Sequence, residues 1–271
     1  PEDKNEIRNA FKSFESHFEE PLSDMDPLKY VGIVLVDGLS RAEECLMDAI
    51  GDMTNVTFIG GSAGDDLKFS ATHLYANGKC YDKGAILAIM KPAIKYTCVK
   101  TQSFKVLDKT FKVTKPGKIA REVQELNNKP AAVAYAAAVG VPIEEAPKYF
   151  IKNPVGLMID DEPYVRSIQK FNSDGIAFFC GVLEGMELSL LESMDIITDT
   201  KKAIEQARAS LGHISAIILF NCCLRAEELK QKNIIDKYGE LFGGYPTIGF
   251  NTYGEQYIGN LNHTATMIVF G

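Results

Sequence analysis

Tryptophan is absent from this 271-residue chain, histidine occurs only four times, and long apolar runs are missing. The longest apolar stretch, residues 131–143, contains Pro142 and is shorter than the ~18 residues that a membrane-spanning helix needs, so no membrane span is predicted. Acidic residues outnumber basic ones by 36 to 29, and there is no basic cluster. The net charge of −7 therefore argues against nucleic acid or an anionic membrane as a partner. Otherwise, 46% hydrophobic and 24% charged residues are typical of a globular protein.

The cysteines form no Cys-x-x-Cys pair, and several lie inside apolar, strand-like runs. This usage predicts free thiols in a reducing compartment, and hence a cytoplasmic location. No signal peptide is recognisable, and the first residue is Pro1, which predicts a fragment of a longer or processed chain. The six cysteines are Cys45, Cys80, Cys98, Cys180, Cys222 and Cys223.

An internal repeat is the most informative pattern in the chain. Residues 32–37 read GIVLVD and are followed, after three residues, by Arg-Ala-Glu-Glu at 41–44. Residues 216–221 read AIILFN and are followed, after three residues, by the same four letters at 225–228. Each apolar run predicts a buried strand, and the spacing after it predicts a helix. The match in register indicates two related units.

Three further pairs of segments match between the two copies: a preceding helix (7–18 and 203–211), a glycine-containing turn (58–65 and 247–255) and a closing strand (85–90 and 266–270). We therefore expect an α/β fold made of two related units, with mixed, largely antiparallel sheets and flanking helices. Between the copies, the patterns predict a hairpin at 105–113, short helices at 119–126 and 131–139, and antiparallel strands at 155–159, 164–171, 176–180 and 187–191.

Several of these blocks resemble the FIST family of sensory domains. Residues 221–225 (NCCLR), 248–256 (IGFNTYGEQ) and 262–264 (NHT) are similar to the C-terminal FIST domain. Residues 59–65 (IGGSAGD), with Asn77-Gly78 after them, are similar to the end of the paired N-terminal domain. The resemblance implies a partial N-type domain at 1–115 and a C-type domain at 116–271.

The resemblance also implies a function. FIST domains are sensory modules of signalling proteins, so we expect a small-molecule ligand, such as an amino acid or a similar zwitterion, and a downstream signalling protein or domain as partner. The resemblance implies no reaction, and no enzymatic activity or cofactor is expected. The oligomeric state, the ligand and the signalling output are left open by the sequence.

A serine or cysteine hydrolase that uses Ser62 or Cys222 is the main alternative, and an interaction scaffold without a ligand is the third. Gly60-Gly61-Ser62-Ala63-Gly64 matches the Gly-x-Ser-x-Gly nucleophile elbow, but no helix pattern follows Ser62, as that elbow requires. Cys222 lies where a strand meets a helix start, which can lower the pKa of a thiol. A glycine turn and a packed strand end are the structural interpretations of the same residues, and we favour them. No His-x-x-x-His, Cys-x-x-Cys or calcium-loop spacing exists, so no metal site is predicted.

The repeated arginine suggests a site. Arg41 and Arg225 are each expected in the first turn of a helix, where a cation is unfavourable to the helix dipole. Each is expected either to pair with a carboxylate of the glycine turn, such as Asp65 or Glu255, or to bind a ligand anion. We predict a ligand site at the carboxyl end of the strand at 217–220, where an acid-binding and a base-binding group suit a zwitterion. Its predicted residues are Asn221, Cys222, Arg225, Asn251, Tyr253, Glu255 and Gln256.

Overall fold

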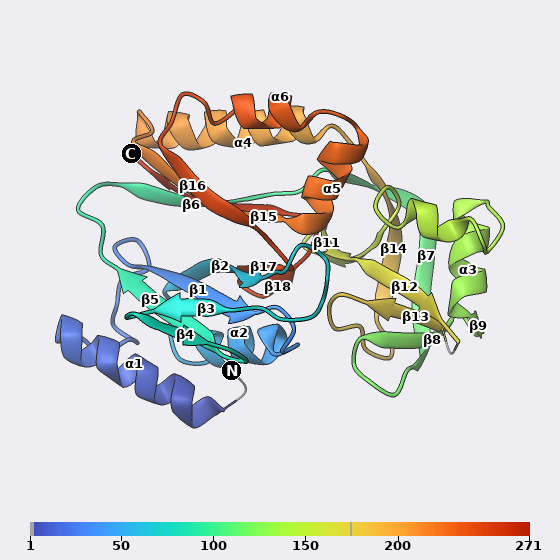
Figure 1. The fold of residues 1–271 in the computed structure, drawn as a ribbon, viewed down its shortest axis with the longest axis horizontal. Helices are drawn as coiled ribbons and strands as arrows, with labels where there is room; N and C mark the ends of the chain where they lie inside the picture. The colour runs from blue at the N-terminus through green and yellow to red at the C-terminus, as the bar shows by residue number, and fades with distance from the viewer. Residues whose placement is uncertain (1–2, 174) are drawn as a thin grey trace.

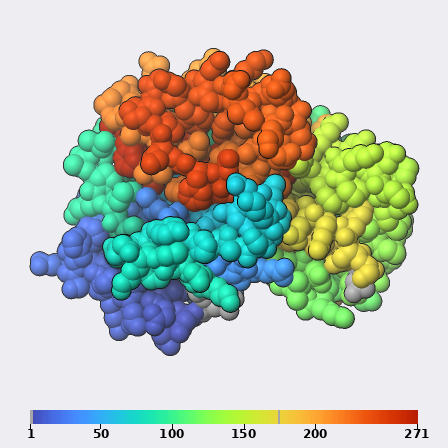
Figure 2. Space-filling view, viewed as in Figure 1, coloured from blue at the N-terminus to red at the C-terminus, as the bar shows by residue number. Residues whose placement is uncertain are grey.

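Two β-sheets packed face to face, with helices on their outer sides, form the centre of the molecule (Figure 1). The computed structural model describes residues 3–173 and 175–271. A third sheet with one helix forms a lobe at one side of this four-layer core (Figures 1 and 2). The fold is α/β with mostly antiparallel sheets, as predicted.

The N-terminal unit supplies most of a five-stranded sheet in the order β18-β17-β2-β1-β5. β1 and β2 are parallel, and β5 runs antiparallel to β1. Two helices cover the outer face of this sheet (Figure 1). The elements are α1 (Lys4–Phe18), β1 (Val31–Asp37), α2 (Glu43–Gly51), β2 (Thr57–Ala63), β5 (Ala85–Met90), β17 (Glu255–Tyr257) and β18 (Asn260–Leu261), with the small hairpin β3 (Leu74–Ala76) and β4 (Lys79–Tyr81) beside them.

The C-terminal unit supplies most of a four-stranded sheet in the order β16-β15-β19-β6. β15 and β16 are parallel, and β19 runs antiparallel to β15. Three helices lie over its outer side (Figure 1). The elements are β6 (Tyr96–Thr101), α4 (Ile196–Leu211), β15 (Ala216–Cys222), α5 (Cys223–Gln231), α6 (Ile235–Glu240), β16 (Thr247–Thr252) and β19 (Ala265–Phe270).

The side lobe is an eight-stranded antiparallel sheet in the order β11-β10-β14-β7-β8-β13-β12, with β9 added to β8. One helix packs on it, and the segment before β10 is a short 3-10 helix at Ala146–Tyr149. The elements are β7 (Phe104–Pro116), β8 (Glu122–Leu126), β9 (Lys129–Pro130), α3 (Ala131–Val139), β10 (Val155–Ile159), β11 (Glu162–Arg166), β12 (Ile168–Asn172), β13 (Gly175–Phe178) and β14 (Glu187–Ser193).

Three predictions for this lobe are wrong. The expected single strand at 164–171 is two strands, β11 and β12, which stand at opposite ends of the sheet order. The expected hairpin at 105–113 is one long strand, β7, which pairs with β14 along its first part and with β8 along its last. The segment at 119–126, expected to be a helix, instead leads into strand β8. Its apolar side chains are buried by pairing with β7 and β13 rather than along a helix face, because neighbouring strands supply the partners.

Alternation explains why the central strands are apolar on both faces. In β1, Val34 and Val36 face α1 and α2, whereas Val31 faces the other sheet. In β19, Met267 faces the helices of its own unit, and Ile268 lies between the sheets. Successive side chains of a strand point to opposite faces, so a strand between a helix layer and a second sheet needs apolar residues at every position.

The two units share a connectivity of strand, helix, parallel strand and closing antiparallel strand. Each unit also has a closely packed glycine in its second parallel strand, at neighbouring rather than equivalent register positions. A Cβ atom on Gly60 would lie 1.7 Å from the carbonyl oxygen of Val34, and one on Gly249 would lie 1.9 Å from that of Leu219. Both parallel strand pairs therefore approach too closely for a side chain. Superposition of the whole units stays a prediction.

The units are joined by exchanged strands. β6 follows the N-terminal unit in the chain but pairs with β19 of the C-terminal sheet. β17 and β18 follow β16 but extend the N-terminal sheet through β2, with Glu255 opposite Gly61. Each sheet thus contains strands from both halves of the chain, which fixes the two units against each other. None of the described helices is both long and apolar enough to span a membrane.

Candidate functional site

A cleft of about 530 Å³ lies where the parallel strands β15 and β16 end and α5 begins. The C-terminal unit forms its floor, and residues 64–67 of the N-terminal unit form one wall. Carboxyl ends of parallel strands commonly carry ligand sites in α/β folds. The lining residues are Gly64, Asp66, Leu67, Leu219, Asn221, Cys223, Ala226, Glu227, Leu229, Lys230, Ile235, Tyr238, Gly249, Phe250, Asn251 and Tyr253.

A hydrogen-bonded amide pair marks the polar part of this cleft. Asn221, the penultimate residue of β15, donates from Nδ2 to Oδ1 of Asn251 at 2.9 Å. The hydroxyl of Tyr238 donates to Oδ1 of Asn221 at 3.1 Å. Asn221 is buried and Asn251 is exposed, so the pair leads from the floor of the cleft to solvent. Parallel pairing places residues 221 and 251 opposite each other.

Charges of both signs line the same cleft as the amide pair. Glu227 and Lys230 on α5 form an ion pair of 3.8 Å, and Asp66 belongs to the wall from the N-terminal unit. α5 begins at Cys223, and the side chain of Cys222 does not cap it. The start of a helix carries a partial positive charge. The cleft therefore offers anionic and cationic groups beside an apolar surface.

Tyr253 ties the N-terminal wall to the cleft. Its hydroxyl donates to the carboxylate of Asp65 and accepts the backbone N–H of Leu67 at 2.7 Å. Its ring lies 5.0 Å from that of Phe69. The hydrogen bond from Tyr253, followed by backbone N–H donors, holds the pKa of Asp65 far below its usual range, and burial raises the pKa of Tyr253 to about 12. Figure 2 shows the segment around residues 65–69, in cyan, against the orange C-terminal unit.

Three of the seven predicted site residues line the cleft: Asn221, Asn251 and Tyr253. The other four are buried behind its wall. Arg225 and Cys222 belong to the start of α5 and the end of β15, and Glu255 and Gln256 belong to β17 in the neighbouring sheet. Glu255 and Gln256 are separated from the cleft because the chain leaves the four-stranded sheet after Thr252 and enters the other one.

Arg225 has partners other than the predicted carboxylates. α5 begins at Cys223, so Arg225 is its third residue and lies in the first turn, as predicted, where its side chain contacts Thr200 of α4. Its Nη2 donates to Oγ1 of Thr200 at 2.6 Å, and its guanidinium lies 5.7 Å from the ring centre of Tyr238. The contacts found across residues 3–173 and 175–271 do not include an ion pair from Arg225 to Glu255 or Asp65. Arg225 instead supports the tyrosine that holds Asn221.

Arg41 is not equivalent to Arg225. It is exposed, has a positive φ of 58° and precedes α2, so the expected helix-dipole conflict does not arise. In the described part of this unit the two glutamates after Ala42, rather than Arg41, form ion pairs. Arg121 Nη2 lies 2.7 Å from Oε2 of Glu43 and 2.6 Å from Oε2 of Glu44, and joins the side lobe to α2. Burial raises the pKa of Glu43, and the charge of Arg121 offsets only part of that effect.

Glu255 is enclosed by threonines. Thr264 donates to Oε2 from its hydroxyl at 2.6 Å and from its backbone N–H at 3.2 Å, and Oε1 contacts the Thr252 hydroxyl. The Thr252 hydroxyl also lies 3.4 Å from the carbonyl oxygen of Asn221. Burial raises the pKa of Glu255 well above its ordinary value. A proton on Glu255 lets the carboxyl donate to Thr252, and Thr252 to Asn221, so both contacts are satisfied.

The hydrolase alternative finds no support in this geometry. Ser62 is fully buried within β2, where its hydroxyl donates to Glu43 at 3.2 Å and accepts from Gln256 at 3.1 Å. Residues 64–73, which are all described, contain no helix, so the elbow is missing. Burial raises the pKa of the Cys222 thiol well above its ordinary value, which opposes formation of a nucleophilic thiolate.

Sequence reasoning did not predict five charged or aromatic residues of the cleft, namely Asp66, Glu227, Lys230, Tyr238 and Phe250. A signal for one of them was present. Glu227 belongs to the repeated Arg-Ala-Glu-Glu, one turn after the start of α5. Tyr238 lies on α6, a separate short helix, and its approach to Asn221 depends on the packing of that helix on α5.

Comparison with known proteins assigns both halves of the chain to one family. Residues 1–129 match the FIST N domain, and residues 131–258 match the FIST C domain. The chain is also similar to an uncharacterized protein of Methanocaldococcus jannaschii, with 24% identity over 226 residues. That alignment covers 78% of this chain and 43% of the relative, so the matched region spans less than half the length of that protein. FIST domains are a sensory signalling module, and the chain belongs to the FIST family, with a FIST N domain followed by a FIST C domain.

Proposed function

We propose that this FIST pair binds a small zwitterion, such as an amino acid, in the cleft at the end of β15 and β16. One observation supports this most directly: the lining of the cleft combines the Asn221–Asn251 amide pair with carboxylates, an ammonium group and apolar side chains. A volume of about 530 Å³ is within the range of small-molecule sites.

The charges give the ligand an orientation. The ligand ammonium lies toward Asp66 and Glu227, and the ligand carboxylate lies toward Lys230 and the start of α5. The amides of Asn221 and Asn251 donate and accept between these two ends. An apolar ligand side chain packs on the apolar part of the lining, which includes Leu219, Leu229, Ile235 and Phe250.

The position of the cleft suits a sensor. Its walls come from both units, so a bound ligand stabilises one arrangement of residues 64–67 against α5. We propose that a downstream signalling protein or domain detects this change. FIST sensory domains are usually non-catalytic, and the burial of Ser62 and Cys222 agrees with binding rather than catalysis. The six free cysteines suit a cytoplasmic, reducing location.

Isothermal titration calorimetry with the standard amino acids tests this proposal. At least one amino acid should bind, and its analogues without the amine or without the carboxylate should bind at least about tenfold more weakly, because each loses a charged hydrogen bond of about 1.5–3 kcal/mol.

Variants then locate the site. Asn251→Ala and Lys230→Met should each weaken binding by about tenfold. Lys201→Met is the matched control, because Lys201 pairs with Glu205 on the exposed face of α4, outside the cleft lining. Absence of binding across the whole series, or equal losses for Lys230→Met and Lys201→Met, would reject the proposal.

A further inference from the structure

The hairpin β3–β4 carries three potential metal ligands on one face. Asn77 and Gly78 have φ angles of 51° and 72°, which make a two-residue turn between the strands. The register pairs Leu74 with Tyr81 and Tyr75 with Cys80. One step beyond, His73 lies opposite Asp82. Because alternate residues share a face, His73, Cys80 and Asp82 project on the same side.

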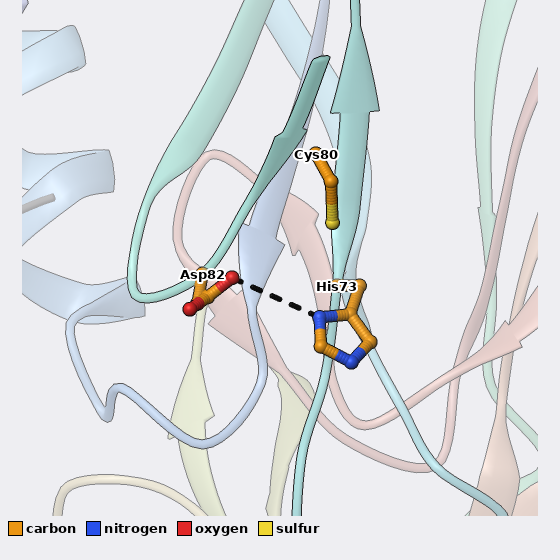
Figure 3. A group of neighbouring side chains, drawn as sticks. All are labelled: His73, Cys80 and Asp82. Atoms are coloured by element: carbon orange, nitrogen blue, oxygen red, sulfur yellow. Dashed lines mark ion pairs between the residues drawn. The ribbon is translucent and has the colours of Figure 1, made fainter.

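Figure 3 shows these three side chains converging at the base of the hairpin. Nδ1 of His73 lies 3.8 Å from Oδ1 of Asp82, and one ligand atom of each residue lies within 4.8 Å of the others. This is the one group of three or more His, Cys, Asp or Glu side chains with such spacing in the part of the chain that the structure describes.

We propose that His73, Cys80 and Asp82 bind a zinc ion. An imidazole, a thiolate and a carboxylate are the three side-chain groups that bind Zn²⁺ in proteins. Tetrahedral coordination with bonds of about 2.0–2.3 Å places ligand atoms roughly 3.3–3.7 Å apart. The observed separations therefore need side-chain rotations that move atoms by about 1 Å or less, without a change in the backbone register.

The backbone on both sides of the ligands is held in place. Oδ1 of Asp37 accepts the hydroxyl of Thr72, and its Oδ2 accepts the backbone N–H of Lys83 at 2.7 Å. Thr72 immediately precedes His73, and Lys83 immediately follows Asp82. Burial alone would raise the pKa of Asp37, but these hydrogen bonds lower it, so the Asp37 carboxylate stays ionised and keeps both contacts. The ligand-bearing ends of the hairpin are thus pre-positioned.

The site is open to solvent on one side. The side chains of His73 and Asp82 are 50% and 74% exposed, and both line a second cleft, of about 660 Å³. Three protein ligands leave the fourth zinc position for water or another small ligand from that cleft. This cleft shares none of its lining residues with the one at the end of β15, so the zinc site stands independently of the proposed function.

Metal titration of the untagged, fully reduced protein tests the site. Zn²⁺ should bind with one equivalent in competition with a chromophoric chelator, and Co²⁺ should give the thiolate-to-metal charge-transfer band that reports cysteine ligation. Cys80→Ser should abolish that band and weaken Zn²⁺ binding at least about tenfold, and His73→Ala and Asp82→Asn should each weaken it by a similar factor.

Matched controls separate the site from general surface binding. Cys45→Ser removes another exposed cysteine, and His213→Ala removes another exposed histidine. Both should leave the affinity and the Co²⁺ band unchanged. The proposal is overturned if less than half an equivalent of Zn²⁺ binds, or if Cys80→Ser and Cys45→Ser behave alike. Circular dichroism of each variant shows whether the fold is retained.

Discussion

The protonated state of Glu255 leads to a quantitative prediction about stability and pH. Burial raises the pKa of this carboxyl above its ordinary value of 4.5 in the folded protein. Between 4.5 and the raised pKa, the folded state binds a proton that the unfolded state has lost. The free energy of unfolding therefore falls as pH rises through this window, and falling pH restores it, with full effect below 4.5.

Glu255→Gln should remove this dependence. A glutamine has the same shape, can donate to Thr252 and can accept from Thr264, so the hydrogen bonds that enclose the side chain are kept. The variant cannot ionise. Its stability relative to wild type should therefore improve with pH, with a slope that approaches about 1.4 kcal/mol per pH unit within the window.

Urea denaturation at intervals of half a pH unit from 4.5 to 8 measures this slope. The difference between the two proteins is the relevant quantity, because other titrating groups contribute equally to both. His263 is one such group, because burial lowers its pKa from the ordinary 6.5 to about 3. Its contribution to stability is therefore complete above pH 6.5 and is lost as the pH falls toward 3. A difference that is independent of pH, or that favours wild type increasingly with pH, would refute the reasoning.

Three further predictions concern packing and ion pairs. Gly249→Ala should lower the free energy of unfolding by about 3 kcal/mol in urea denaturation, because the new Cβ would lie 1.9 Å from the Leu219 carbonyl oxygen. Gly51 has open space around it, so the control Gly51→Ala should leave this free energy unchanged or raise it by up to ~1 kcal/mol. Arg121→Met should lower the free energy of unfolding by about 3–5 kcal/mol, because Glu43 and Glu44 lose their shared cation. Adding Glu43→Gln to this variant should recover part of that loss. Equal stability of the single and double variants would contradict this account. Tyr253→Phe should raise the pKa of Asp65 toward its ordinary 3.8 in an NMR titration, because the tyrosine hydroxyl is its strongest donor, and an unchanged pKa would show that the backbone donors suffice.

The central strands and most helices could be predicted because their signals are local. The apolar runs that become β1 and β15 are buried on both faces, and alternation alone requires that pattern. α1 and α4 have the spacing of amphipathic helices, and each begins after an aspartate that caps it, Asp3 and Asp195.

The side lobe shows where local signals fail. Residues 119–126 have helix-like apolar spacing, yet Val123 and Leu126 are buried in strand β8. Asn127 and Asn128 both have positive φ, which makes a tight turn into β9. That turn signal was present in the sequence but was outweighed by the apolar spacing. Pairing partners from β7 and β13 decided the outcome, and such partners are not visible in a local window.

The α/β class, the order of strand, helix and strand in each unit, and the family could be predicted from the sequence, because they depend on periodicity and on short motifs. Which polar residues share a site depends instead on tertiary packing. Asn251 and Glu255 are four residues apart, but one lines the cleft and the other is enclosed in the neighbouring sheet. The chain changes sheets between them, and no local pattern encodes that change, because the pairing of β17 with β2 joins residues from opposite halves of the chain.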